Sequence, residues 1–136
     1  MITKHYQFKF DFQTPFRLLD GARVRIDRSE GVLYQHGLVK DNFVILELAG
    51  QPFFNLMKHR RFRLTIESED QGLFAFPEIV FIKERKKRSF ADRGSKTVYF
   101  VTPDYDDFAV RVRVRGAGKT QLIALRADMI DDGQTN

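Results

Sequence analysis

The residues with the clearest chemical potential are arginines at alternate positions of the segment FAVRVRVR, residues 108 to 115. Alternation with a period of two is typical of a β-strand, where residues two apart share one face and lie about 6.8 Å apart. Arg111, Arg113 and Arg115 would then project to one side, and guanidinium groups bind phosphate in bidentate fashion. One prediction is therefore phosphate binding, either along a nucleic-acid strand or on a compact phosphorylated ligand. The other is an exposed arginine face that pairs with acidic neighbours such as Glu67.

A second concentration of positive charge lies at both ends of the segment from Lys58 to Arg88. The segment is predicted to form two strands joined by a tight turn at Glu69 to Gly72, where Gly72 can adopt a positive φ. If the strands pair, the two clusters meet at one end of the hairpin. The clusters are Lys58, Arg60, Arg61 and Arg63, and Lys83, Arg85, Lys86, Lys87 and Arg88; all of them except Lys83 are assigned, with the arginine strand, to a predicted anion-binding site.

Catalytic and metal-binding constellations are poorly represented. The three histidines lack metal-ligand spacing, and no serine has the context of a nucleophile elbow. The absence of cysteine excludes disulfides, thiolate metal sites and a cysteine nucleophile. Gly116 to Thr120, GAGKT, ends like a phosphate-binding P-loop, but Arg113 occupies the position of the required first glycine. We predict a non-enzymatic protein that uses no cofactor and no metal.

The bulk composition favours an anionic partner. The chain of 136 residues carries a formal net charge of +5 and has a pI near 9.6. Such a balance favours a nucleotide, a nucleic acid or an acidic protein surface as the partner. No apolar run has the length of a membrane span or a signal peptide, so we expect a soluble, cytoplasmic protein without membrane insertion.

The hydrophobic pattern predicts an all-β, mainly antiparallel fold, a small closed or split β-barrel with one or two short helices. The single domain would span residues 1–136, with a mobile basic loop at 84–96 and a frayed tail at 131–136. Helical turns are expected near residues 16–19 and 53–59, and residues 120–130 fit either a helix or a strand. Turns are predicted at 40–42, 69–72 and 116–118. Strands are predicted at residues 7–12, 22–26, 32–39, 43–48, 62–66, 73–83, 97–102 and 108–115.

The order of these segments resembles the split barrels of the bacterial PilZ group, in particular the barrel that precedes the PilZ domain in flagellar-brake proteins. The resemblance covers roughly residues 16–115. It is carried by the segments Gly21 to Ile26, Phe43 to Pro52, Phe62 to Lys83 and Thr97 to Arg115, which occur in the same order.

PilZ domains that bind cyclic di-GMP use R-x-x-x-R followed by [DN]-x-S-x-x-G. Arg111 to Arg115 matches the first motif, and Asp128 to Gly133 matches the second except that Ile130 replaces the serine. The resemblance implies a regulatory PilZ-like barrel that acts by protein contact or by binding a phosphorylated ligand such as cyclic di-GMP. The alternative is a basic nucleic-acid-binding β-barrel in which exposed aromatic residues stack on bases.

Overall fold

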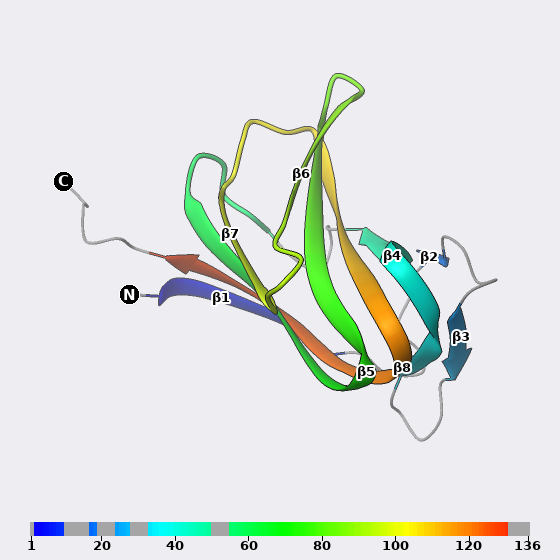
Figure 1. Ribbon diagram of the computed structural model, residues 1–136. Coiled ribbons are helices and arrows are strands. Elements are labelled where there is room, and N and C mark those ends of the chain that lie inside the picture. The colour runs from blue at the N-terminus through cyan, green and yellow to red at the C-terminus, as the bar shows by residue number, and fades with distance from the viewer. Residues whose placement is uncertain (1, 10–16, 19–23, 28–32, 50–54, 131–136) are drawn as a thin grey trace.

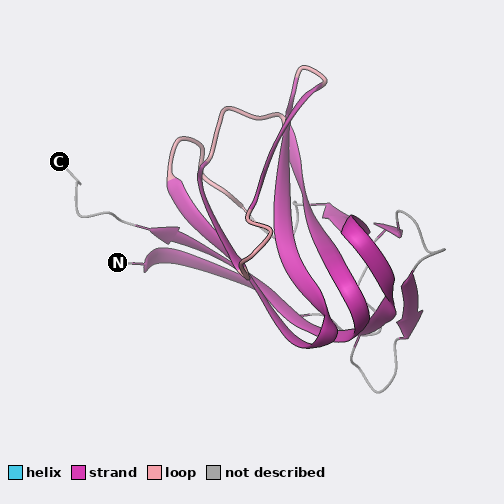
Figure 2. Ribbon diagram, in the orientation of Figure 1, coloured by secondary structure: helices cyan, strands magenta, loops and turns pink. Residues whose placement is uncertain are grey.

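The fold is described by a computed structural model for residues 2–9, 17–18, 24–27, 33–49 and 55–130. Within these ranges the protein is all-β, as predicted, and every strand pairing is antiparallel (Figure 2). None of the described segments forms a helix long and apolar enough to cross a membrane. The strands are β1 (Ile2–Lys9), β2 (Arg17–Leu18), β3 (Val24–Asp27), β4 (Leu33–Ala49), β5 (Arg61–Lys83), β6 (Lys86–Ala91), β7 (Thr97–Val101) and β8 (Asp107–Ile130).

Three long strands form the centre of one sheet, with β8 between β4 and β5. The first half of β8 pairs with β4 on its other side, and the second half pairs with β1. In the same way β6 pairs with the second half of β5, while β7 pairs with its first half. The sheet curls into a half-barrel whose edge strands β6 and β7 approach each other (Figure 1).

The curl is produced where β4, β5 and β8 bend along one line across the sheet, which we call the crease. The crease comprises residues 40–42 of β4, 71–73 of β5 and 116–118 of β8, which are brought together by the register. The pairing register shifts at these points in β4 and β5. The sequence predicted turns at the same three places. That prediction is wrong, because each strand continues beyond the bend and pairs with the same neighbour.

Glycines allow the strands to approach closely at the crease. Gly72, Gly116 and Gly118 have φ values of 90°, 104° and 136°, a region that residues with a side chain rarely adopt. A Cβ atom on Gly118 would lie 2.0 Å from the Gln71 carbonyl oxygen, and one on Gly72 would lie 2.1 Å from the Ala117 oxygen. Both neighbours are backbone atoms that belong to paired strands, so they have little freedom to move away.

The concave side of the sheet encloses an aromatic core. Phe62, Leu64 and Ile66 are buried there, as the alternation predicted. The Phe62 ring lies 6.1 Å from the Phe100 ring, and Phe100 lies 5.7 Å from Phe81, measured between centroids. Because Phe62 and Phe81 come from opposite halves of β5, this single strand supplies two walls of the core.

The predicted helices are not found among the described residues. Arg17 and Leu18 form an edge strand against Glu47 and Leu46. Residues 55–60 lack regular structure because their polar groups are satisfied from elsewhere in the chain: the Thr102 hydroxyl donates to the Met57 carbonyl at 2.6 Å, and the Tyr105 hydroxyl donates to that of Leu56. Residues 120–130 belong to β8, which resolves the alternative between a helix and a strand.

The segment 84–96, predicted as a loop, contains strand β6. Its backbone pairs with β5 from Glu78↔Ala91 to Lys83↔Lys86, so polar composition did not prevent strand formation. Only Glu84 to Arg85 and residues 92–96 remain as connections. The expected tail at 131–136 and the helical positions 16, 19, 53 and 54 lie outside the described residues.

Replacement of a crease glycine is expected to destabilise the protein strongly. Gly118→Ala introduces a Cβ atom against the backbone at a φ of 136°, and we expect the free energy of unfolding to fall by at least about 2 kcal/mol. Gly94→Ala is the matched control, because its Cβ atom would meet only the Asp92 side chain at 3.9 Å. Urea unfolding of both variants measures the difference. Equal stability of the two would show that the crease tolerates a side chain.

Candidate functional site

Asp104 joins the segment that precedes β5 to the end of β5. Lys58 Nζ lies 3.1 Å from Asp104 Oδ1, and Lys83 Nζ lies 3.5 Å from Asp104 Oδ2. The two lysines belong to the two different basic clusters, so one member of each cluster lies beside Asp104. The predicted pairing of the two strands of the hairpin does not occur, because both halves of β5 pair with β8 rather than with each other.

The second cluster forms the hairpin that joins β5 to β6, and we call residues 83–88 the basic tip. Lys83 pairs with Lys86, so the turn contains only Glu84 and Arg85. Their φ values of 49° and 69° are in the left-handed region, which fits a two-residue hairpin but normally requires glycine or asparagine. The turn is therefore strained, at a cost of roughly 1–2 kcal/mol for each residue.

Asp106 supports this strained turn. Its Oδ2 atom accepts a hydrogen bond from the Glu84 backbone N–H at 3.0 Å, and its Oδ1 atom accepts one from Lys83 Nζ at 3.3 Å. The Asp106 backbone N–H donates to the Ile82 carbonyl at 2.8 Å. The hydrogen bond to Asp106 and the charges of Asp104 and Asp106 raise the pKa of Lys83. Lys83 therefore belongs to the support of the tip.

The remaining cations of the tip point into solvent. Arg85, Lys86, Lys87 and Arg88 are all exposed. The Arg88 guanidinium lies 5.0 Å from the centre of the Phe90 ring. Within the described part of the chain, no carboxylate forms a salt bridge with any of these four side chains. The tip presents four uncompensated positive charges on a projecting hairpin (Figure 1).

Two of the three arginines on the arginine strand pair with carboxylates. Arg111 Nε donates to Glu47 Oε2 at 2.7 Å, and its NH1 atom lies 3.4 Å from Glu78 Oε1. Arg113 Nε lies 3.0 Å from the same Glu78 oxygen. Burial works to lower the pKa of Arg111, but Glu47 and Glu78 outweigh it and the pKa is raised. Pairing with acidic neighbours therefore occurs, although the neighbours are Glu47 and Glu78 and not Glu67.

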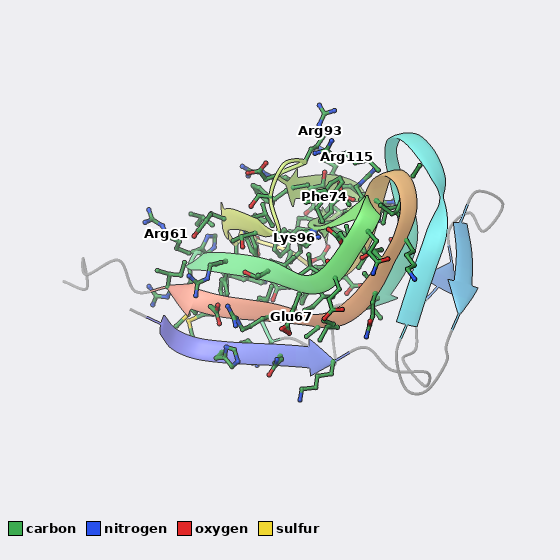
Figure 3. The ribbon with its side chains drawn as sticks, turned by 60° about the horizontal axis from the view of Figure 1, so that its bottom comes forward. Arg61, Glu67, Phe74, Arg93, Lys96 and Arg115 are labelled. Atoms are coloured by element: carbon green, nitrogen blue, oxygen red, sulfur yellow. The ribbon has the colours of Figure 1, made fainter. Side chains whose placement is uncertain are left out.

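The third arginine of the strand packs on an aromatic ring. The Arg115 guanidinium lies 5.1 Å from the centre of the Phe74 ring, and Lys96 Nζ lies 4.3 Å from the same centre (Figure 3). Arg115 Nε also donates to the Arg93 carbonyl at 3.2 Å. Arg115 therefore contacts the 92–96 connection, whereas Arg111 pairs with Glu47 and Glu78.

Lys96 is the centre of a polar cluster that sequence reasoning missed. Its amine donates to Ser68 Oγ at 2.7 Å, to the Ala75 carbonyl and to Asp70. Burial lowers the pKa of Lys96, with Asp70 opposing that shift. Hydrogen bonds from Lys96, Thr120 and Ser68 outweigh burial at Asp70 and lower the pKa of that carboxyl. The ionised pair holds the 92–96 connection against the bend of β5.

The first basic cluster lies near a second acidic centre, Asp128. This carboxylate is fully buried, accepts two hydrogen bonds from Arg63 at 2.8 and 3.1 Å, and lies 2.6 Å from His5 Nδ1. Arg126 Nε approaches to 3.3 Å. Burial alone would raise the pKa of Asp128, but His5, Arg63 and Arg126 lower it. Arg63 is therefore a structural partner of Asp128.

The other members of this cluster differ in their surroundings. Lys58 is paired with Asp104, and Arg60 Nε lies 3.4 Å from Met57 Sδ. Arg61 is exposed beside β7, where its partner in the register is Val101. The predicted anion site is thus divided into the basic tip, the arginine strand and a mixed surface around Arg61. The sequence contained no signal for this division, since it depends on which carboxylate lies across each strand.

Asp128 is expected to make stability depend on acidic pH. Because its folded pKa is below the ordinary value of about 3.9, its contribution is complete above that pH and is lost as the pH falls through the folded pKa. Asp128→Asn should lower the free energy of unfolding by about 2 kcal/mol near neutral pH. It should also reduce the loss of stability as the pH becomes acidic. Urea unfolding between pH 7 and pH 2 measures both effects. Glu69→Gln removes an exposed carboxylate and should keep the wild-type dependence of stability on pH. If the stability of Asp128→Asn fell as steeply with acid as that of the wild type, Asp128 would not be the source of the dependence.

Relief of the strained turn is expected to stabilise the protein. Arg85→Gly removes a side chain from a φ of 69° and should raise the free energy of unfolding by about 1 kcal/mol. Lys86→Gly is the matched control, because it removes the same charge from a paired strand position and should lower stability. Thermal unfolding of the two variants gives the comparison. A lower melting temperature for Arg85→Gly would show that the turn is unstrained.

No protein-family model and no curated protein sequence matches the chain. Solved structures with similar folds are the glycosylation-associated protein (Gap123) complex from Streptococcus agalactiae, with a TM-score of 0.72 and 12% identity, and accessory secretory protein 1, 2 and 3 from Streptococcus pneumoniae, with a TM-score of 0.67 and 11% identity. The matched regions cover 91% and 90% of this chain. The match covers 44% of the first structure's chain and 96% of the second's.

A third similar structure is the CBM22-1 xylan-binding domain of Xyn10C from Paenibacillus barcinonensis. It has a TM-score of 0.61 and 6% identity, and the match covers 96% of both chains. At these identities the likeness concerns the fold alone. The chain therefore shares its fold with the two streptococcal structures and with a xylan-binding domain. The resemblance to PilZ-type barrels stays a prediction.

Proposed function

We propose that the protein is a non-catalytic binding module that docks on an acidic surface of a partner protein through the basic tip. The observation that carries the proposal is the set of four exposed cations, Arg85 to Arg88, none of which pairs with a described carboxylate. Asp106 holds the backbone of the strained turn that carries them. Charged groups arranged in advance lose less entropy on binding than flexible ones.

The form of the tip favours a protein surface over a compact phosphorylated ligand. Small ligands bind in concave sites that enclose most of their surface, whereas the tip is a projecting hairpin (Figure 1). Glu47 and Glu78 pair with Arg111, which is one of the two arginines, Arg111 and Arg115, that the PilZ resemblance would use for cyclic di-GMP. Two of the similar folds occur in protein complexes, which supports a protein partner. The absence of cysteine is compatible with the cytoplasmic location that we propose for this contact.

A nucleic acid is the second candidate, and Tyr99 favours it. This ring is 61% exposed and lies across from Arg63 in the register of β5 and β7. Stacking of bases on exposed aromatic rings beside positive charge is the usual mode of single-strand binding. The two candidates differ in the surface they require, because the tyrosine is on β7 and Arg85 to Arg88 are on the tip.

Binding to four probes should separate the candidates. We expect poly-L-glutamate to bind, with an affinity that falls as salt rises and falls about tenfold further in Lys86→Glu/Lys87→Glu. Lys9→Glu/Lys119→Glu reverses two exposed charges elsewhere and should change the affinity much less. The other probes are a short single-stranded DNA, cyclic di-GMP and a xylan oligosaccharide, each titrated by calorimetry.

Three results would contradict the proposal. Equal weakening by the two double variants would show that only net charge matters. Tighter binding of the DNA, lost in Tyr99→Ala, would establish the second candidate. Heat from cyclic di-GMP or from the oligosaccharide, unchanged in Lys86→Glu/Lys87→Glu, would place the functional site away from the tip.

A further inference from the structure

Strand β7 has one edge that is unpaired among the described strands. Its register with β5 is fixed by hydrogen bonds from Ile66 N to Lys96 O and from Thr102 N to Arg60 O, both 2.9 Å long. In an antiparallel ladder the backbone groups of alternate residues point to alternate sides. Val98 and Phe100 therefore bond to β5, while the N–H and C=O groups of Tyr99 and Val101 point away from it.

The side chains of the same two residues are also exposed. Tyr99 is 61% exposed and Val101 is 55% exposed, whereas Val98 and Phe100 are buried. Edge strands are ordinarily protected from pairing by lysine, proline or a bulge. The β7 sequence, TVYFV, contains no charged residue and no proline, and its register with β5 is regular. An apolar, β-branched and aromatic edge of this kind readily accepts another strand.

A groove of about 590 Å³ lies at the start of this edge. It is lined by residues of the β6–β7 connection, including Asp92, Arg93 and Ser95, and extends to Tyr99. Ser95 Oγ already accepts the Thr97 N–H at 3.0 Å, which leaves Tyr99 and Val101 as the open positions of the edge. The groove provides space beside β7 for the backbone of an added strand.

The charges around the edge specify an acidic occupant. Arg61 is exposed across from Val101, and Arg93 lines the groove; neither forms a salt bridge with a described carboxylate. An added strand would lie two strand spacings from Arg61, about 10 Å, which an arginine and a glutamate side chain together span. Among the described residues that line the groove, Asp92 balances the charge of Arg93, so Arg61 leaves one net positive charge beside the edge.

We propose that β7 accepts an extended acidic segment of a partner protein as an added strand, which lies in the groove and extends the sheet. A second copy of this chain fits less well, because it would bring Arg61 and a net charge of +5 to the same edge. The added strand uses the backbone of Tyr99 and Val101 and does not require the basic tip. This contact can therefore exist whether or not the tip docks on the same partner.

Amide hydrogen exchange measured by NMR on the whole chain tests the proposal. In the free protein, Tyr99 and Val101 amides should exchange rapidly, and Val98 and Phe100 amides should be protected. Addition of the acetylated and amidated peptide Glu-Val-Glu-Val-Glu-Val should slow exchange at Tyr99 and Val101 at least about tenfold, which corresponds to about 1.4 kcal/mol of protection. The peptide Lys-Val-Lys-Val-Lys-Val has the same alternation and should leave exchange unchanged.

Two variants define the contact. Val101→Pro removes the outward N–H but no hydrogen bond to β5, and should abolish protection at Tyr99; Val101→Thr keeps the N–H and should bind like the wild type. Continued protection of Val98 and Phe100 confirms that the proline variant is folded. If the proline variant is not folded, Arg61→Glu provides the test. This variant leaves the backbone intact and should weaken binding of the acidic peptide at least about tenfold.

Four outcomes would overturn the proposal. Protection of Tyr99 and Val101 in the free monomer would mean that the chain covers its own edge. Protection that appears with dimerisation would identify a second copy as the occupant. Equal binding of both peptides would remove the argument from charge. Peptide-induced shifts confined to residues 83–88, lost in Lys86→Glu/Lys87→Glu, would assign the acidic segment to the tip and leave the proposed docking function standing alone.

Discussion

The structure depends on the close approach of two backbones at the crease. A strand of 23 residues would extend about 76 Å if it were straight, and a flat sheet of such strands would leave one face without a partner. The bend in β5 brings its two halves face to face, so that Phe62 and Phe81 contribute to the same aromatic core. Only glycine permits the approach, because the carbonyls of Gln71 and Ala117 occupy the positions that Cβ atoms would need. The other features of the fold, including the meeting of Lys58 and Lys83 at Asp104, therefore depend on the crease.

The existence of most strands could be predicted from the sequence, whereas their continuity could not. Alternation at residues 62–66 and 108–115 identified the correct inward faces, since period two depends only on neighbouring residues. A turn and a bend share the same local composition, as Glu69 to Gly72 shows. What distinguishes them is whether the strand continues along the same neighbour, and that information is held by residues such as Lys119, about fifty positions away. The continuity of β8 through Gly116 to Gly118 was hidden for the same reason.

The distribution of charge could likewise be predicted from the sequence only in part. The sequence predicted that Arg111, Arg113 and Arg115 share a face of one strand, and the strand has that form. Whether such a face binds a ligand depends on the strands across from it, which place Glu47 and Glu78 beside two of the arginines. Likewise Asp128, which appeared only as part of an incomplete motif, is the buried partner of Arg63 and His5. Charge pairing across the sheet thus neutralises two of the three arginines that looked most suited to phosphate, and the basic tip keeps its charge.

The basic tip and the β7 edge share a physical property. Each contains a locally unfavourable feature, a strained turn in one and an unprotected strand edge in the other, that the fold does not require. Glycine at position 85 would relieve a positive φ, and a lysine at position 99 or 101 would protect the edge of β7, yet neither position belongs to the aromatic core. The two features are also adjacent in the chain, because β6 leads from the tip to the groove beside β7. A partner with an acidic surface and an acidic extended segment could engage both, and the second contact would form at the high effective concentration set by the first. Two individually weak contacts on one rigid sheet would then give a stable and selective complex.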